Sequence, residues 1–152
     1  MIKDSKITAE KVADYFLTKD SMTPKKLQKL VYYAYAWFIV QHHEDDKKAT
    51  LFEEKPEAWI HGPVFPSLYK KYKDTGWGMI KQKTEKVEFE NKEVQNFLDE
   101  IWKIFGKYSA DQLEYMTHHE DPWIKARGNK RPFEPSTEKI LYEDIYTYYS
   151  TL

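Results

Sequence analysis

The segment from Trp59 to Tyr69 constrains the fold of this chain more than any other. It reads Trp-Ile-His-Gly-Pro-Val-Phe-Pro-Ser-Leu-Tyr. A strand-like run ends at Gly62-Pro63, a dipeptide that interrupts regular structure, and Pro66 has the position that proline favours in the first turn of a helix. We therefore expect a sharp corner between a short strand and a helix.

Apolar residues at helical spacing, together with capping residues, predict about six helices. The second has the clearest start, because Thr23 can cap it while Pro24 occupies the first helical position. A capping box, Ser109-Ala110-Asp111-Gln112, opens the fifth. The expected N-caps or first residues are Thr8, Thr23, Pro66, Asn91, Ser109, and either Ser136 or Thr137.

The second predicted helix is apolar on more than one side. Its main stripe includes Leu30 and Val31, yet Tyr32, Ala36 and Ile39 lie nearly opposite, and no charged residue occurs between Val31 and His43. A helix that is apolar all round is buried, either by the rest of its own chain or by a partner.

Two short segments predict strands. Residues 57–60 form an apolar run before the corner, and residues 86–90 alternate in polarity as a half-buried strand does. We expect these two segments to pair. The predicted fold class is mainly α (α+β): a compact helical domain of about six helices with a small two-stranded β element. A length of 152 residues is that of one domain, 1–152.

Composition excludes several classes of function. The chain has no cysteine, so it can form neither a disulfide nor a thiolate site. Lys and Arg number 24 against 25 Asp and Glu, and the only arginines are Arg127 and Arg131, so nucleic acid is not the expected partner. No apolar run approaches the roughly 20 residues of a membrane span. We expect a cytoplasmic protein.

Histidine-rich segments at 42–45 and 118–121 share the letters His-His-Glu-Asp. Adjacent helical residues point about 100° apart, so such a pair cannot chelate one ion from one face. A hydrolase would need His61 close to Glu120 or Asp121, and the chain has no recognisable nucleophile elbow. We expect no catalytic, cofactor-binding or metal-binding residues.

Cations and aromatic rings provide the remaining candidates. The stretch from Arg127 to Arg131 is a solvated loop or a contact for a phosphate or an acidic peptide. Lys25, Lys26 and Lys29 form the solvated edge of their helix. Tyrosines recur at i, i+4 and i+7 in the last helix, either as a broad core stripe or as a second face for a partner. The candidate partner-binding residues are Tyr32, Ala36, Ile39, His61, Tyr142, Tyr146 and Tyr149.

Three motifs in order carry a family resemblance: residues 22–33, the corner at 59–69, and Thr-His-His-Glu-Asp-Pro-Trp at 117–123. Together they resemble the SocA-like, GepA-related antitoxin domain that is also called Panacea. The resemblance implies a mainly helical antitoxin of a type II toxin–antitoxin system. It would neutralise a cognate toxin, encoded by the adjacent gene, through direct protein–protein binding.

The resemblance also leaves alternatives. Related proteins act as adaptors that deliver a bound toxin to a cytosolic protease. A phage-associated regulator that blocks a host protein would use the same binding physics without a toxin. Neither alternative implies an enzyme, and the hydrolase is the weakest hypothesis because its residues form no recognisable constellation.

Overall fold

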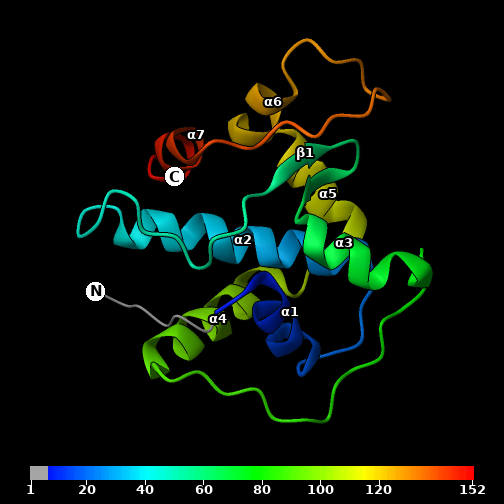
Figure 1. Cartoon of the computed structure of the whole chain (residues 1–152), viewed down its shortest axis with the longest axis vertical. Coiled ribbons are helices and arrows are strands. Elements are labelled where there is room, and N and C mark those ends of the chain that lie inside the picture. The colour runs from blue at the N-terminus through cyan, green and yellow to red at the C-terminus, as the bar shows by residue number, and fades with distance from the viewer. Residues whose placement is uncertain (1–6) are drawn as a thin grey trace.

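The computed structural model describes residues 7–152. Figure 1 shows α2 crossing the middle of the molecule, with α1 and α4 below it and the hairpin, α6 and α7 above it. The elements, in chain order, are α1 (Ala9–Leu17), α2 (Pro24–His42), β1 (Glu57–Trp59), β2 (Gly62–Val64), α3 (Pro66–Tyr72), the 3₁₀ turn η1 (Lys73–Thr75), α4 (Lys92–Phe105), α5 (Ala110–His118), α6 (Asp121–Arg127) and α7 (Tyr142–Tyr149).

The central helix α2 is buried on both of its apolar faces. Leu30 and Val31 on the main stripe are fully buried, and so are Tyr32, Ala36 and Ile39 on the opposite face. Contacts come from α1 and α4, from β2 and α5, and from α7. The sequence left open whether the chain itself or a partner buries this helix. The structure shows that the rest of the chain covers it.

Capping residues set the predicted helix starts. The hydroxyl of Thr8 accepts a hydrogen bond from an amide in the first turn of α1, Thr23 does the same for α2, and the Asn91 side chain does so for α4. Ser109 and Gln112 form the full reciprocal capping box of α5. These starts confirm the mainly helical prediction, and the structure adds a short helix, α6, which begins within the third motif.

The small sheet pairs different segments from those expected. β1 and β2 form an antiparallel hairpin in which Trp59 faces Gly62, so the predicted pairing of residues 57–60 with 86–90 is wrong. A nearby partner after a tight turn costs less chain entropy than a distant one. Residues 86–90 are not a strand; they carry Phe89 into the core, where its ring meets Tyr15 edge-on.

The last helix also begins later than predicted. Neither Ser136 nor Thr137 caps α7, which starts at Tyr142. The chain before it is extended and lies along the free edge of β1, where the amide of Ala58 donates to the carbonyl oxygen of Glu138 (2.8 Å). The chain stays extended here despite the local capping residues, because the backbone groups on the buried edge of β1 need hydrogen-bond partners.

Burial in this last segment follows the extended start of α7. Apolar spacing in the sequence predicts that Ile140, Leu141 and Ile145 face inward. Ile140 and Ile145 are buried, whereas Leu141 is 58% exposed. Leu141 has extended backbone geometry at the N-cap and therefore does not follow the helical spacing. Within residues 7–152, no helix is long and apolar enough to cross a membrane.

The hairpin turn depends on Gly62. Its φ is +113°, a region that side chains rarely adopt, and a Cβ built there would lie 2.7 Å from Cε of Lys29 and 3.0 Å from Oγ1 of Thr117. Glycine therefore lets the hairpin approach α2 and α5 closely.

We expect Gly62→Ala to lower the free energy of unfolding by about 3 kcal/mol, because it combines backbone strain with overpacking. Gly76→Ala is the matched control. Gly76 also has a positive φ of +61°, but a Cβ added there would meet no atom within 4 Å, so only strain of about 1–2 kcal/mol applies. Urea unfolding measures both variants. Equal losses would mean that Lys29 and Thr117 move aside freely.

Candidate functional site

One glutamine fastens the corner between β2 and α3 to the central helix. The side-chain amide of Gln28 donates to the carbonyl oxygen of Phe65 (3.1 Å), and the backbone amide of Phe65 donates to Oε1 of Gln28 (2.8 Å). Both residues are buried. A buried backbone group without a partner costs about 1–3 kcal/mol, so this pair holds the corner in place.

The neighbouring residue, Lys29, lies beneath the hairpin. Its side chain is 1% exposed, and Nζ donates to the carbonyl oxygen of Pro63 (3.2 Å). Among residues 7–152, no carboxylate lies within ion-pair distance of this ammonium group. Burial lowers the pKa of Lys29 to about 7, although the negative charge of Glu114 opposes the shift.

The third motif packs against the hairpin from α5 and α6. Thr117 is fully buried beside Gly62. The indole N–H of Trp123 donates to the carbonyl oxygen of Trp59 (2.9 Å), and the His118 ring stacks on Trp123 with centroids 4.0 Å apart. Burial lowers the pKa of His118, which favours the neutral ring. All three sequence motifs therefore meet around the hairpin.

Glu120, also in the third motif, joins α2 to α7. The hydroxyls of Tyr33 and Tyr149 donate to its Oε1 at 2.8 and 2.6 Å, and the Tyr32 and Tyr149 hydroxyls lie 3.1 Å apart. Burial raises the pKa of Glu120, and the two tyrosine hydrogen bonds partly offset this shift. The Glu120 carboxylate is therefore already hydrogen-bonded to tyrosines of the core.

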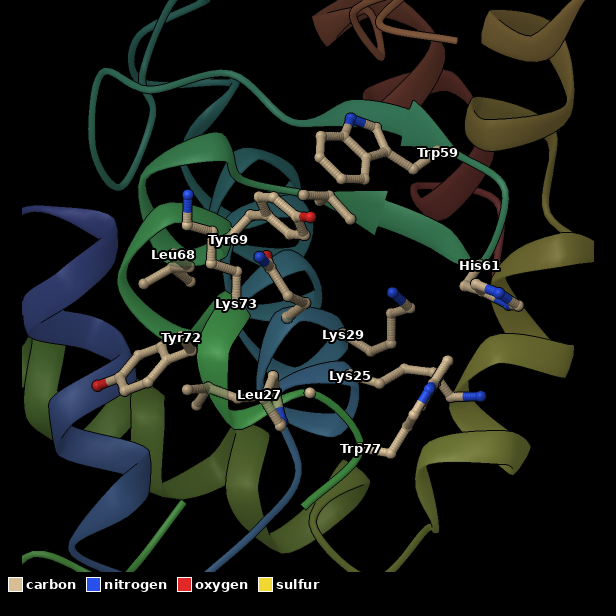
Figure 2. Close-up of a pocket in the computed structure, with 14 residues that line it drawn as sticks. Lys25, Leu27, Lys29, Trp59, His61, Leu68, Tyr69, Tyr72, Lys73 and Trp77 are labelled. Atoms are coloured by element: carbon tan, nitrogen blue, oxygen red, sulfur yellow. The ribbon is translucent and has the colours of Figure 1, made fainter. Parts of the chain in front are cut away.

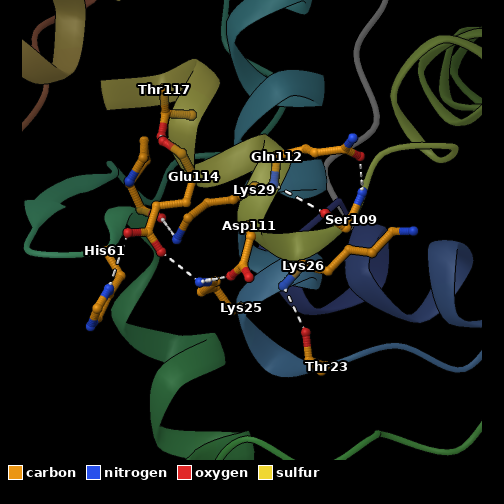
Figure 3. A network of polar contacts seen from close by, with 11 residues as sticks. Thr23, Lys25, Lys26, Lys29, His61, Ser109, Asp111, Gln112, Glu114 and Thr117 are labelled. Atoms are coloured by element: carbon orange, nitrogen blue, oxygen red, sulfur yellow. Dashed lines mark hydrogen bonds and ion pairs between the residues drawn. The ribbon is translucent and has the colours of Figure 1, made fainter. Parts of the chain in front are cut away.

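A second polar network lies nearer the surface, where Figure 3 shows Glu114 between Lys25 and His61. Nζ of Lys25 lies 2.7 Å from Asp111 and 2.6 Å from Glu114, and Nδ1 of His61 lies 3.3 Å from Glu114. Burial alone would raise the pKa of Glu114, but hydrogen bonds from Lys25 and His61 lower it overall. The charge of Lys25 is therefore balanced within the chain.

A cavity of about 330 Å³ lies beside these networks, between the first turns of α2, the hairpin, α3 and η1 (Figure 2). Its rim carries exposed rings: Tyr69 is 47% exposed and Trp77 is 74% exposed. The lining residues are Pro24, Lys25, Leu27, Gln28, Lys29, Trp59, His61, Val64, Leu68, Tyr69, Tyr72, Lys73, Gly76 and Trp77.

A protein-family model described as "Antitoxin SocA-like, Panacea domain" matches residues 27–124. The chain belongs to this family. The matched residues include Gln28, Lys29, the hairpin and the third motif, so the resemblance seen in the sequence is confirmed. Neither the curated proteins nor the solved structures contain a match to this chain.

In this Panacea domain, four of the candidate partner-binding residues belong to the core. Tyr32, Ala36 and Ile39 are fully buried, and Tyr149 is 1% exposed. None of these four side chains lines the cavity, so they are not accessible to a partner on the folded chain. The broad-core alternative accounts for them, because α2 and α7 pack on each other.

The other three candidates are accessible but lie apart. The His61 side chain is 53% exposed at the hairpin turn. Tyr142 and Tyr146 lie at the opposite end of α2, where the Tyr142 hydroxyl is 3.1 Å from Nδ1 of His43 and the Tyr146 ring stacks on the same imidazole. Their role in partner binding stays a prediction, and the structure does not unite them into one surface.

The arrangement expected of a hydrolase is not formed. His61 contacts Glu114, whereas Glu120 is engaged with buried tyrosines. In the described part of the chain, no group of three or more His, Asp or Glu side chains is arranged to hold a metal ion.

The cationic face that a nucleic-acid binder would need is not formed by the described residues, 7–152. Arg127 is 5% exposed, and its guanidinium donates to the carbonyl oxygen of Arg131 (2.7 Å). Lys29 is buried and Lys25 is ion-paired, so the prediction of a solvated lysine edge is wrong for both. Residues 7–152 therefore do not gather these cations into one exposed surface for phosphate groups.

Sequence reasoning missed Gln28 and Lys29 as parts of the site. A signal existed, because they precede Tyr32 by four and three residues and so share its helix face, whose later residues are apolar. It also missed Tyr69 and Trp77, since local sequence does not say which aromatic rings remain exposed.

We expect Lys29→Met to change how stability depends on pH. The pKa of Lys29 is about 7 in the folded chain and has its ordinary value of 10.5 in the unfolded chain. Between these values the unfolded chain binds more protons, so this group makes the free energy of unfolding of the natural protein rise from about pH 7 to about pH 10.5. Lys29→Met lacks this contribution, so its stability should rise less over this pH range. Urea unfolding of both proteins at several pH values measures the difference.

Lys25→Met is the control for this measurement. Lys25 lies one turn earlier on α2, but its hydrogen bonds with Asp111 and Glu114 outweigh burial and raise its pKa. This variant should keep most of the rise between pH 7 and pH 9, because burial lowers the pKa of Lys29 more than the charge of Lys25 does. Parallel pH profiles for Lys29→Met and the natural protein would contradict a lowered pKa for the buried Lys29 amine.

Proposed function

We propose that this chain is the antitoxin of a type II toxin–antitoxin system and neutralises a cognate toxin by binding it directly. The observation that carries the proposal is membership of the SocA-like antitoxin family over residues 27–124. The toxin is encoded by the adjacent gene. The antitoxin acts as a binding protein and needs neither a cofactor nor a catalytic step.

Exposed aromatic rings around the cavity favour this face as the main toxin-binding surface. Trp77 and Tyr69 stand at the rim, Trp59 packs against Tyr69 with ring centroids 4.8 Å apart, and His61 lies beside Trp77. Tryptophan and tyrosine dominate the energetics of protein interfaces because they bury a large area with little loss of side-chain entropy. We name this surface the aromatic rim.

Tyr142 and Tyr146 provide a second, smaller candidate surface at the other end of α2. Their hydroxyls are already engaged by His43 and by Glu44 (2.9 Å for Tyr146). Leu141 beside them is 58% exposed. This surface has fewer free aromatic rings than the aromatic rim, so it ranks second in the proposal.

Co-expression with the product of the adjacent gene tests the proposed function. Growth rescue together with co-purification of a stable complex is the expected outcome. A neighbour that is harmless alone and forms no complex would contradict the antitoxin proposal. A complex without rescue would instead indicate an adaptor or a regulator of another protein.

We expect Trp77→Ala and Tyr69→Ala each to weaken toxin binding by about 2 kcal/mol, because each removes a ring that the toxin would bury. Calorimetry on the purified pair measures the loss, and unfolding curves check that the fold is intact.

Two variants serve as comparisons. Phe133→Ala removes a ring that is 85% exposed in the segment after α6, which lies far from α3 in Figure 1, and should leave affinity unchanged. Tyr146→Ala tests the second surface. If only Tyr146→Ala weakens binding, the aromatic rim is not the toxin-binding surface.

A further inference from the structure

The cavity within the aromatic rim has an unbalanced charge. Its fourteen lining residues include three lysines and one histidine but no aspartate or glutamate. Lys25 is paired with Asp111 and Glu114. Lys29 and Lys73 have no carboxylate partner among residues 7–152. The lining therefore suits a ligand with a negative charge, because an anion beside Lys29 would favour the protonated form of its amine.

Lys29 is the most specific of these cations. An ammonium group has three N–H donors, and Lys29 uses one of them on the carbonyl oxygen of Pro63. Its side chain is almost fully buried yet borders the cavity. Figure 2 shows it between the hairpin and Trp77. Burying an amine with so few partners costs stability, and an anion in the cavity would offset that cost.

The walls of the cavity are apolar. Leu27, Val64 and Leu68 form the inner surface, and the rings of Tyr69 and Trp77 stand at the mouth. Its volume of about 330 Å³ lies within the range of ligand pockets. A phosphate group or a lone acidic side chain would satisfy the lysines but would leave this apolar surface uncovered.

We propose that the cavity binds the C-terminal residue of a partner polypeptide. The last residue of a chain combines an apolar side chain and a carboxylate on the same Cα, which matches the apolar walls and the Lys29 ammonium group. Recognition of a chain terminus by a built pocket is a common mode of peptide binding. The identity of the partner as a toxin rests on the proposed function, but the chemistry of the pocket does not.

N-acetyl-L-phenylalanine and its neutral amide are matched probes for this inference. Titrations followed by ¹⁵N NMR of the tryptophan indoles locate binding, because Trp59 and Trp77 line the cavity whereas Trp37 and Trp102 do not. We expect shifts at Trp59 and Trp77 and about tenfold tighter binding of the acid, as one charge-assisted hydrogen bond would give. Equal affinities, shifts confined to Trp37 or Trp102, or no binding would each overturn the proposal.

A third probe distinguishes a chain terminus from an internal acidic segment. Acetyl-Asp-Phe-amide has the same apolar ring and one carboxylate, but places the charge on a side chain. We expect it to bind about as weakly as the neutral amide. If it binds as tightly as the acid, the pocket recognises internal acidic sequences, and the proposal of a chain terminus fails.

Substitutions assign the charge to Lys29. Lys29→Met keeps the length of the side chain and should reduce the affinity of the acid to that of the amide. Lys26→Met is the matched control, because Lys26 lies on the same helix but donates to the carbonyl oxygen of Gly106 and does not line the cavity. Unchanged preference for the acid in Lys29→Met would exclude Lys29 as its partner.

Lys73→Ala provides a variant that does not disturb the core, since Lys73 is exposed. It should lower the affinity of the acid by less than Lys29→Met does and leave that of the amide unchanged. If Lys29→Met misfolds, an unchanged acid affinity in Lys73→Ala counts against the proposal. These experiments use no toxin, so they are independent of the co-expression test. Acid binding without growth rescue would contradict the proposed antitoxin function but not the pocket. Growth rescue without acid binding would contradict the pocket but not the antitoxin function.

Discussion

The structure depends on one constraint: α2 must be covered on every side. No charged residue occurs between Val31 and His43, and the side chains on both apolar faces are buried. A single helix cannot cover such a cylinder, so α1 and α4 pack against one side while the hairpin, α5 and α7 pack against the other (Figure 1). The many aromatic rings of the chain fill the resulting gaps, as in the parallel stack of Tyr33 on Phe105.

The N-terminal half of α2 departs from this apolar pattern, and the candidate site is built there. Gln28 and Lys29 are buried polar residues, and each meets the backbone of the corner segment. Gln28 forms hydrogen bonds with two backbone groups, so its burial stabilises the corner. Lys29 makes one hydrogen bond and loses much of its hydration. The lost hydration costs more free energy than one hydrogen bond supplies, so the burial of Lys29 does not stabilise the fold. Sequences often break local rules of this kind at functional sites.

Much of the fold could be predicted because the residues that start a helix lie next to one another in the sequence. Thr8, Thr23 and Ser109 cap helices through residues three positions later, and such signals lie within one turn of chain. The partner of β1 and the extended segment before α7 could not be predicted, because pairing with a sheet edge depends on distant residues. The sequence also could not separate exposed from buried candidates for partner binding: His61 is exposed, whereas Tyr149 is buried because α7 packs on α2.

The tyrosine and glutamate network has a consequence for where this domain can be divided. The family match ends at residue 124, yet Tyr149 on α7 supplies a hydroxyl to Glu120 and covers Tyr32 and Tyr33. The segment that matches the family model therefore lacks one of the side chains that cover Glu120 in this chain. A fragment that ended at residue 124 would expose the rings of Tyr32 and Tyr33 and would leave Glu120 with one of its two tyrosine donors.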